Sequence, residues 1–314
     1  MEPVLTVGVI NYNQGHFINT CLDSIRNQTF KDFELFIIDD HSTDDSVKYI
    51  SNYISEHSLE CNFIINKENQ GICKNLNYLL KTAQGKYLTF IAADDWGDLN
   101  RFETMVSRLE TAPDDVSTIY SDALLVNESG ESLHDSYLKN FRPDLKMPPQ
   151  GDVFADLLSF NFIPAMATVT RTQAIVDVGG FDENLKFEDF DLWLKLADKF
   201  KFLYTNDSKC YYRILPNSLI RTLGARKWED LYAIYEKYLG KSPTTDQLVL
   251  KMLNKCLANL YFTDSVKFKM KFRALRSRSA DSLASDIYAL LSRAGLRGSV
   301  YKKLTNKIVR RKID

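Results

Sequence analysis

Cysteine is scarce in this chain of 314 residues, and its five cysteines form no CxxC pair. This argues against a disulfide framework or a structural zinc site and favours a reducing compartment. Apolar runs are also short, and none approaches the roughly 18 residues of a membrane-spanning helix. The opening Met1-Glu2-Pro3 lacks the basic residues of a secretory signal. We therefore expect a cytoplasmic protein, attached to a membrane only at its surface if at all.

An excess charge of one sign is missing overall, since 40 basic residues balance 41 acidic ones. Locally the balance fails: residues 1–224 carry a net charge of −13, and residues 225–314 carry +12. We interpret this change as a boundary near Gly224, followed by a basic helical region. Such a region predicts an anionic partner, for which an inner-leaflet membrane surface is our hypothesis. Solvated helix faces are the alternative, and liposome binding that survives deletion of 225–314 would reject the hypothesis.

Two amphipathic stripes at helical spacing lie within this basic region. As an alternative to membrane binding, the first stripe predicts that the chain associates with a second copy of itself into a homo-oligomer. The stripes are Val249, Leu253, Cys256, Leu257 and Leu260, and then Leu283, Ile287, Leu290 and Leu291.

The first hundred residues alternate between short apolar runs and segments with helical periodicity. This order predicts right-handed strand–helix–strand crossovers and a mostly parallel sheet flanked by helices, an α/β fold. Beyond residue 100 the pattern loosens: we expect a strand at 165–170 and a long loop at 127–152, where prolines and glycines gather. The expected early strands are 5–10, 33–38, 62–65 and 87–92, each followed by a polar cluster.

Nucleotide-binding loops rich in glycine are absent, since neither GxGxxG nor GxxxxGK[ST] occurs. This excludes the usual dinucleotide oxidoreductases and P-loop enzymes. Instead Asp94-Asp95 follows the fourth expected strand, at the edge where parallel sheets bind ligands. Paired carboxylates at such an edge suit Mg²⁺ or Mn²⁺ bound to a diphosphate, although an exposed turn is the alternative interpretation.

At this point the chain resembles the family 2 (GT-A fold) glycosyltransferases over roughly residues 4–220. The resemblance implies a GT-A nucleotide-diphospho-sugar transferase domain at 1–224, with a donor half at about 1–122 and an acceptor half at about 123–224. Residues 225–314, a C-terminal helical extension, lie outside it. The matching segments are Val9–Asn13, Gln28–Glu34, Ile37–Asp44, Asn69–Gly71, Lys74-Asn75, Gly85–Tyr87, Ala93–Trp96, Gly179–Glu183, Glu188–Trp193 and Tyr212-Arg213.

The family implies transfer of a sugar, with inversion, from a nucleotide-diphosphate donor to an acceptor hydroxyl. A UDP-sugar is the expected donor, and a hexose or N-acetylhexosamine the expected sugar. A glycan or lipid-linked glycan of a bacterial surface polysaccharide is the expected acceptor. The resemblance assigns Tyr12 to stack on the base, Asp40 to bond it, Asp39 to support the nucleoside, Lys74 to approach the diphosphate, Asp94 and Asp95 to hold the ribose and the divalent metal, and Asp189 to act as general base.

Glu188 and Asp191 are the reserve candidates for the general base, and helix capping is the structural alternative for Asp189. Tyr212-Arg213 resembles the acceptor-side motifs of the family, and Arg213 is also a candidate for binding the donor. Two departures from the family pattern, Ala92 and Leu215, replace an acid and a histidine that many members carry. They leave open a non-catalytic nucleotide-sugar or glycan-binding module. A sugar-1-phosphate nucleotidyltransferase is disfavoured because the first loop is neither glycine-rich nor basic, and no nucleic-acid-binding module is recognisable.

Overall fold

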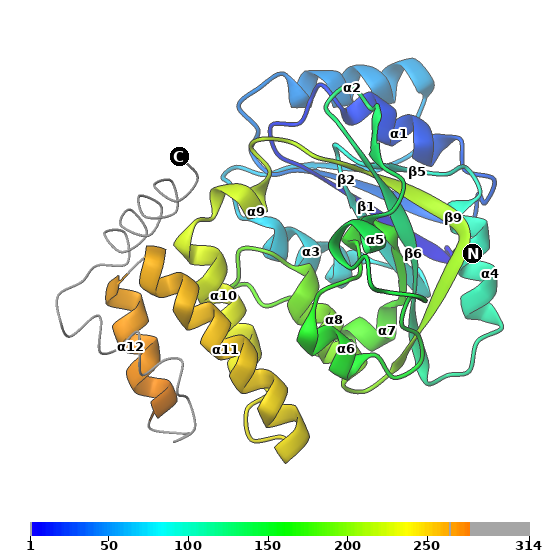
Figure 1. The fold of residues 1–314 in the computed structure, drawn as a ribbon. Coiled ribbons are helices and arrows are strands. Elements are labelled where there is room, and N and C mark those ends of the chain that lie inside the picture. Colours follow the sequence, from blue (N-terminus) through cyan, green and yellow to red (C-terminus); the bar gives the residue numbers. More distant parts are fainter. Residues whose placement is uncertain (1, 264, 277–314) are drawn as a thin grey trace, which may run out of the picture. The chain divides into compact units, whose positions relative to one another are not determined.

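The computed structural model describes residues 2–263 and 265–276. The contacts within the chain divide it into two compact units, Met1–Pro216 and Asn217–Asp314. Figure 1 shows the chain coloured along its sequence. The boundary expected near residue 224 falls inside the second unit, directly after a short helix, α9 (Leu219–Thr222). The two units are described separately below.

The first half of the first unit confirms the predicted alternation of strands and helices. Strands β1 (Leu5–Asn11), β2 (Phe33–Asp39), β3 (Asn62–Ile65) and β4 (Tyr87–Ala92) run parallel in the order β3-β2-β1-β4. Because the strands are parallel and in register, their carboxyl ends meet at one edge of the sheet. The connecting helices are α1 (Ile18–Arg26), α2 (Ser46–His57) and α3 (Ile72–Thr82).

The second half makes the sheet mixed, since β8 (Thr168–Arg171) runs antiparallel to both β4 and β6 (Val116–Val126). Strand β9 (Lys201–Arg213) returns parallel to β6, with its register shifted between Ser121 and Ala123. The short strands β5 (Trp96–Gly97) and β7 (Ser132–His134) pair with β9 and β6. The helices are α4 (Arg101–Glu110), α5 (Tyr137–Phe141), α6 (Phe154–Ser159), α7 (Thr172–Asp177) and α8 (Asp189–Ala197).

Two expected elements differ in the structure. The strand predicted from 165 begins at Thr168, because Ala165–Ala167 form a 3₁₀ turn that leads into it. The predicted long loop at 127–152 contains β7 and α5. Helix α5 exists because Ser136 caps it: its hydroxyl accepts a hydrogen bond from the Lys139 backbone N–H at 3.0 Å.

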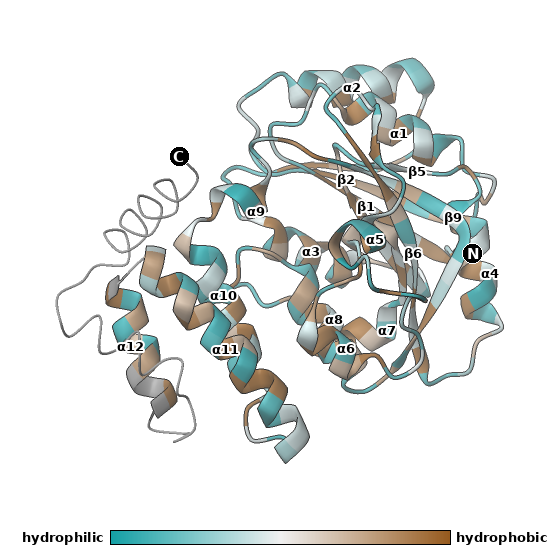
Figure 2. Ribbon diagram, in the orientation of Figure 1, coloured by the Kyte–Doolittle hydropathy of each residue, from teal (hydrophilic) through white to brown (hydrophobic). Residues whose placement is uncertain are grey.

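Apolar side chains on the sheet form the core of the first unit, and in Figure 2 the central strands are largely brown where α2 carries more teal. All seven residues of β1 are buried. Gly8 is required in this strand because Leu79 of α3 packs on it: an added Cβ would lie 2.2 Å from Leu79 Cδ2. The close approach fixes α3, whose first turn carries Lys74, beside the strand that leads into the polar edge.

The second unit is helical where it is described, with α9, α10 (Ala225–Glu236), α11 (Pro243–Thr263) and α12 (Ser265–Arg276). The five side chains of the 249–260 stripe are all buried within the single chain, so the stripe is part of the core of this unit. Self-association of the chain stays a prediction. The 283–291 stripe lies outside the described residues. Within the described part of the chain, no helix combines the length and apolarity needed to cross a membrane. Membrane docking of 225–314 stays a prediction.

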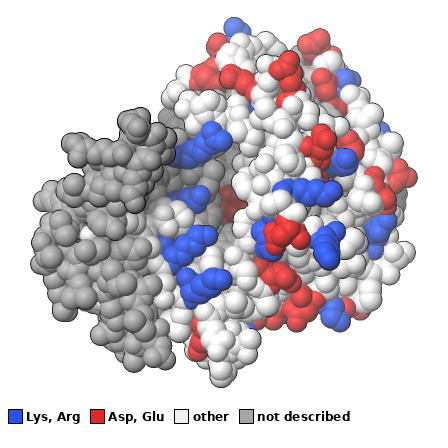
Figure 3. Space-filling model, viewed as in Figure 1, with Lys and Arg blue, Asp and Glu red and all other residues white. Residues whose placement is uncertain are grey.

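Charge on the first unit is dispersed. On the right-hand part of the face drawn in Figure 3, acidic and basic side chains are interspersed, while several basic side chains gather at the left of the coloured surface. The large negative balance of residues 1–224 therefore does not form a single acidic field on this face, and the acids that matter for chemistry are those that the fold buries.

Candidate active site

The carboxyl ends of β1 and β2 are joined by a buried polar network. Asn11 and Asp39 are register partners, and the Asn11 side-chain amide donates to Asp39 Oδ2 at 2.7 Å. The Ser42 hydroxyl donates to the same oxygen at 2.6 Å, and the Ser42 backbone N–H donates to Asp39 Oδ1 at 2.9 Å. Asp39, predicted to support the nucleoside, therefore shapes this loop through both of its oxygens.

Tyr12 stands on the loop that this network fixes. The next residue, Asn13, has a left-handed backbone with φ of 55°, which asparagine tolerates better than most residues. Its side-chain oxygen accepts a hydrogen bond from the Thr43 backbone N–H at 2.7 Å. The Tyr12 ring is 47% exposed, so a planar base can reach one of its faces. This placement is compatible with the stacking role that the resemblance implies.

Asp40 ties the end of β2 to the start of α3. Its two oxygens accept hydrogen bonds from the backbone N–H groups of Gln70 and Gly71 at 2.8 and 2.9 Å, and the Asn66 amide donates to one of them. The Asp40 carboxylate therefore orders the turn before α3, a role that the sequence interpretation missed. Lys74, exposed on the first turn of α3, projects from the helix that this turn positions.

Asp94 and Asp95 follow β4 and are both buried, with Asp95 only 2% exposed. Burial raises the pKa of Asp94 to about 6, although Gln14 and Arg213 partly oppose the shift. Burial, and then the neighbouring charge of Asp94, raise the pKa of Asp95 well above its ordinary value. Holding both acids ionised at neutral pH is costly, and a cation placed between them would relieve that cost.

Arg213, at the end of β9, binds this acidic turn from behind. Its backbone N–H donates to Asp95 Oδ1 at 2.8 Å, and its Nε donates to the Asp94 carbonyl at 3.0 Å. The guanidinium lies between the rings of Phe17 and Trp96, 4.4 and 4.8 Å from their centroids. Because these contacts occupy the side chain, Arg213 positions the acids rather than pointing freely toward a diphosphate.

The two acids fit a divalent cation that is shared with a substrate. Among the described residues, no group of three or more His, Cys, Asp or Glu side chains could hold a metal ion by itself. Two buried carboxylates would supply part of an oxygen shell, and the phosphate oxygens of a donor would supply more of it. Asp94 and Asp95 would hold such an ion.

Glu188 and Asp189 form the second acidic pair, at the start of α8. Burial, and then the charge of Asp189, raise the pKa of Glu188 to about 8. Burial also raises the pKa of Asp189, and the Asn161 amide opposes this shift by donating to Asp189 Oδ2 at 2.9 Å. The other oxygen accepts the Phe190 backbone N–H at 2.7 Å. Asp189 is thus oriented by neutral donors, as a general base must be.

Asp191, the other reserve candidate, is placed differently. It is 1% exposed and forms an ion pair with Lys195, one turn further along α8, at 3.2 Å. An acid that is already neutralised and enclosed suits a structural role on the inner face of the helix.

Tyr212 lies between the two acidic pairs, although the sequence interpretation gave it no role. Its pKa is raised first by burial and then by the charges of Asp95, Asp94 and Asp189. Its ring meets that of Tyr137 edge to face, with centroids 6.0 Å apart. Burial and the charge of Asp189 likewise raise the pKa of Tyr137. Acids of both pairs therefore raise the pKa of Tyr212, and Asp189 also raises that of Tyr137.

The Tyr212-Arg213 motif could have pointed to Tyr212, whereas nothing in the sequence singled out Tyr137, which falls in a segment expected to be a loop. Cys73, on α3, also lies near the acids at the start of α8. Burial, and then the charges of acids that include Glu188 and Asp189, raise the pKa of its thiol to about 12. The helix that follows the Asp40 turn thus borders the acids of α8.

Comparison with known sequences identifies the family. The pattern described as Glycosyl transferase family 2 matches residues 6–158. The protein EpsH of Bacillus subtilis is 30% identical over 239 residues, which are 74% of this chain and 67% of that relative. The chain belongs to glycosyl transferase family 2. The matched segment holds both strand-end loops and Asp94-Asp95 and ends before Glu188.

Solved structures with the same fold extend the likeness across both halves of the first unit. The mannosyltransferase PcManGT of Pyrobaculum calidifontis, in complex with GDP-Man and Mn²⁺, has a TM-score of 0.63 at 17% identity, covering 97% of this chain and 84% of that one. TarS 1–349 of S. aureus, in complex with UDP-GlcNAc, has a TM-score of 0.61 at 19% identity, covering 85% and 75%. They confirm the predicted GT-A fold.

Proposed function

We propose that this member of glycosyl transferase family 2 transfers a sugar, with inversion, from a nucleotide-diphosphate donor to an acceptor hydroxyl. The observation that carries the proposal concerns Tyr212: the charges of Asp95, Asp94 and Asp189 all contribute to raising the pKa of its hydroxyl. A donor held by the first two acids would therefore lie within reach of the third. That neighbourhood is what in-line displacement needs, since the attacking hydroxyl must meet a base opposite the leaving group.

Donor binding would use the two strand-end loops. Tyr12 is exposed beside the Asp39–Ser42 network, where a base can stack on its ring. Lys74 on the first turn of α3 would approach the diphosphate. A UDP-sugar is our expected donor, which UDP-GlcNAc in TarS supports, whereas GDP-Man in PcManGT supports a mannosyl donor as the second choice.

A divalent ion, Mn²⁺ or Mg²⁺, would be held by Asp94 and Asp95. When bound, such an ion stabilises the negative charge that develops on a leaving diphosphate. The Mn²⁺ in PcManGT supports this assignment. The raised pKa values of the two acids support it as well, because a cation would restore their ionised forms.

Asp189 would take the proton from the acceptor hydroxyl. Its raised pKa makes it a stronger base than an exposed aspartate, and the amide of Asn161 fixes one of its oxygens. Glu188 beside it is the reserve. A glycan or lipid-linked glycan is the expected acceptor, and bacterial surface polysaccharide synthesis is the expected setting.

The alternative is a module that binds nucleotide sugars without turning them over, which the Ala92 and Leu215 departures suggested. A thermal-shift panel with UDP-glucose, UDP-GlcNAc and GDP-mannose, each with and without Mn²⁺, tests donor binding directly. A ligand present at about 100 times its Kd stabilises a protein by about 2.7 kcal/mol. We expect one donor to raise the Tm in a Mn²⁺-dependent way and to be slowly hydrolysed. No shift with any of the three donors contradicts the proposal.

A further inference from the structure

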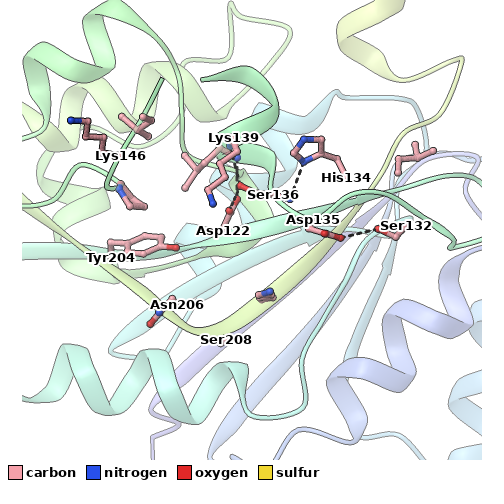
Figure 4. A pocket seen from close by; sticks show the side chains of 15 residues that line it. Asp122, Ser132, His134, Asp135, Ser136, Lys139, Lys146, Tyr204, Asn206 and Ser208 are labelled. Atoms are coloured by element: carbon pink, nitrogen blue, oxygen red, sulfur yellow. Dashed lines mark hydrogen bonds between the residues drawn. The ribbon is translucent and has the colours of Figure 1, made fainter. Parts of the chain in front are cut away.

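The first unit holds a pocket of about 690 Å³ whose lining includes neither acidic pair. Figure 4 shows it between the segment that runs from β7 through α5 and the middle of β9, from Tyr204 to Lys209. Its size falls in the range typical of small-molecule sites. It is built by the β7–α5 segment that follows β6 and by the irregular stretch of β9 at residues 206–209, where the β6–β9 register shifts.

Three lysines from three different segments line this pocket: Lys139 on α5, Lys146 in the segment that follows, and Lys209 on β9. In the part of the chain that is described, none of their ammonium groups forms an ion pair with a carboxylate. Lysines gathered from separate segments without partners favour an anionic ligand, and the compact ammonium group suits phosphate.

Two aspartates also line the pocket, and they must be set against the lysines. Asp122 is already saturated by protein donors: its Oδ1 accepts the backbone N–H groups of Ala123 and Leu138, and its Oδ2 accepts the Ser136 hydroxyl. Asp135 is exposed and lies 3.4 Å from the Ser132 hydroxyl. With three lysines against two aspartates, the lining therefore keeps a net positive charge.

Ser208 gives an independent indication of a ligand. This pocket residue is 1% exposed, and its hydroxyl oxygen is buried without a hydrogen-bond partner. Buried hydroxyls without partners are rare, because the loss of water is then uncompensated. The rest of the lining is largely apolar and includes the Tyr204 ring, a surface that suits the face of a sugar. Donors, positive charge and an aromatic ring together describe a site for a phosphorylated sugar.

Helix α5 connects this pocket with the candidate active site. Ser136, Leu138 and Lys139 line the pocket, while the ring of Tyr137 between them meets that of Tyr212, with centroids 6.0 Å apart. Tyr212 directly precedes Arg213, which bonds Asp94 and Asp95, and the charge of Asp189 acts on Tyr137 as well. We propose that the pocket binds a phosphate-bearing sugar of the acceptor, as a subsite separated from the general base by α5. The identity of the ligand as acceptor rests on the transferase function proposed above.

The binding test uses the full chain, with saturating UDP and Mn²⁺ to occupy the donor site. Glucose 6-phosphate and glucose, which differ only in the phosphoryl group, are titrated by calorimetry. Because a hydrogen bond to a charged group contributes about 1.5–3 kcal/mol, we expect the phosphate to strengthen binding by about tenfold or more. The combined change Lys139→Gln, Lys146→Gln and Lys209→Gln should abolish that preference. Lys48→Gln, on the exposed face of α2, is the matched control and should keep it.

Ser208→Ala separates ligand binding from folding. Removal of a buried hydroxyl without a partner should leave the Tm unchanged or raise it, while binding of glucose 6-phosphate weakens several-fold. Unchanged binding in this variant, or a phosphate preference that survives the triple lysine change, overturns the proposal. So does equal binding of the two sugars by the unmodified protein. In a separate titration that begins without UDP, displacement of bound glucose 6-phosphate by added UDP would place the probe in the donor site and overturn the proposal too.

The two proposals fail separately. If no donor shifts the Tm of the unmodified protein but the pocket shows the lysine-dependent preference, the transferase function fails and the phosphosugar site remains. If donors bind and the triple variant keeps both donor binding and the phosphate preference, the transferase function remains and the pocket proposal is rejected.

Discussion

Two pairs of adjacent acids, Asp94-Asp95 and Glu188-Asp189, lie in the first unit and meet different surroundings. The first pair follows a strand and is held by Arg213, whose backbone and side chain both donate to it. The second pair begins a helix, and the donors to Asp189 are the neutral amide of Asn161 and a backbone N–H. Burial raises the pKa values in both pairs.

The difference between the pairs indicates a difference in their chemistry. Asp94 and Asp95 have one cationic neighbour, Arg213, and their two carboxylates would still be stabilised by a metal ion. Acids that are oriented by neutral groups, with raised proton affinity, are prepared to accept a proton. Similar dipeptide sequences thus have different neighbours in this fold, and for that reason we propose different roles for them.

The largest effect is expected for Asp189→Asn. The variant keeps the side-chain shape but cannot accept the acceptor proton, and proton transfer by a positioned base contributes typically about 10²–10⁴-fold to the rate. Transfer should fall by that factor while the donor-induced Tm shift is unchanged. The measurement is kcat alongside donor affinity from thermal shift.

Asp191→Asn is the matched control, two residues along the same helix. It breaks the pair with Lys195, so the Tm should fall while kcat stays within a few-fold of the original. If Asp191→Asn abolishes transfer and Asp189→Asn does not, the roles assigned within α8 are wrong.

A smaller effect, about 10- to 100-fold, is expected on Mn²⁺ affinity and activity for Asp95→Asn. Because this change removes a buried charge that raises the energy of the folded state, the metal-free protein should also become more stable. The opposite movement of Tm and activity is the distinguishing result. Lower stability with unchanged Mn²⁺ affinity would argue for a purely structural Asp95.

The last expected effect concerns pH. In the folded protein Asp94 has a pKa of about 6 and Glu188 one of about 8, above ordinary values near 4. The folded state thus binds these protons more tightly, and its stability should fall as the pH rises from about 4 through 6 to 8. Urea unfolding across that range should show a loss of stability of several kcal/mol, since each unit of difference in pKa corresponds to about 1.4 kcal/mol. Glu188→Gln should flatten the upper part of the curve; a stability that rises with pH contradicts these shifts.

Much of the donor half was predictable from the sequence because strands such as Leu5–Asn11 are short, apolar and closed by polar residues. The position of Asp94-Asp95 at the sheet edge followed from that pattern. Local periodicity carries this information, and parallel pairing brings the strand ends together without further assumptions.

The remaining features depend on contacts between distant residues. Nothing local indicates that Asp40 would bond the turn before α3, or that β9 would bring Arg213 to Asp95, 118 residues away. Tyr137 acquires its place only because Ser136 caps a five-residue helix within a segment rich in proline and glycine. The sequence therefore predicted which residue types gather at the site, but not which long-range contacts each of them makes.

The clamp formed by Phe17, Arg213 and Trp96 has a consequence for modularity. The family pattern ends at residue 158, yet the only N–H that bonds the Asp95 carboxylate within the described chain, and the guanidinium beneath Asp94, both belong to residue 213. A fragment that ends at residue 158 would keep Asp94 and Asp95 and would lose Arg213, which contacts both of them. A truncated version of this chain therefore needs to extend at least to Arg213, well beyond the segment that the family pattern matches, if Asp94 and Asp95 are to keep their cationic neighbour.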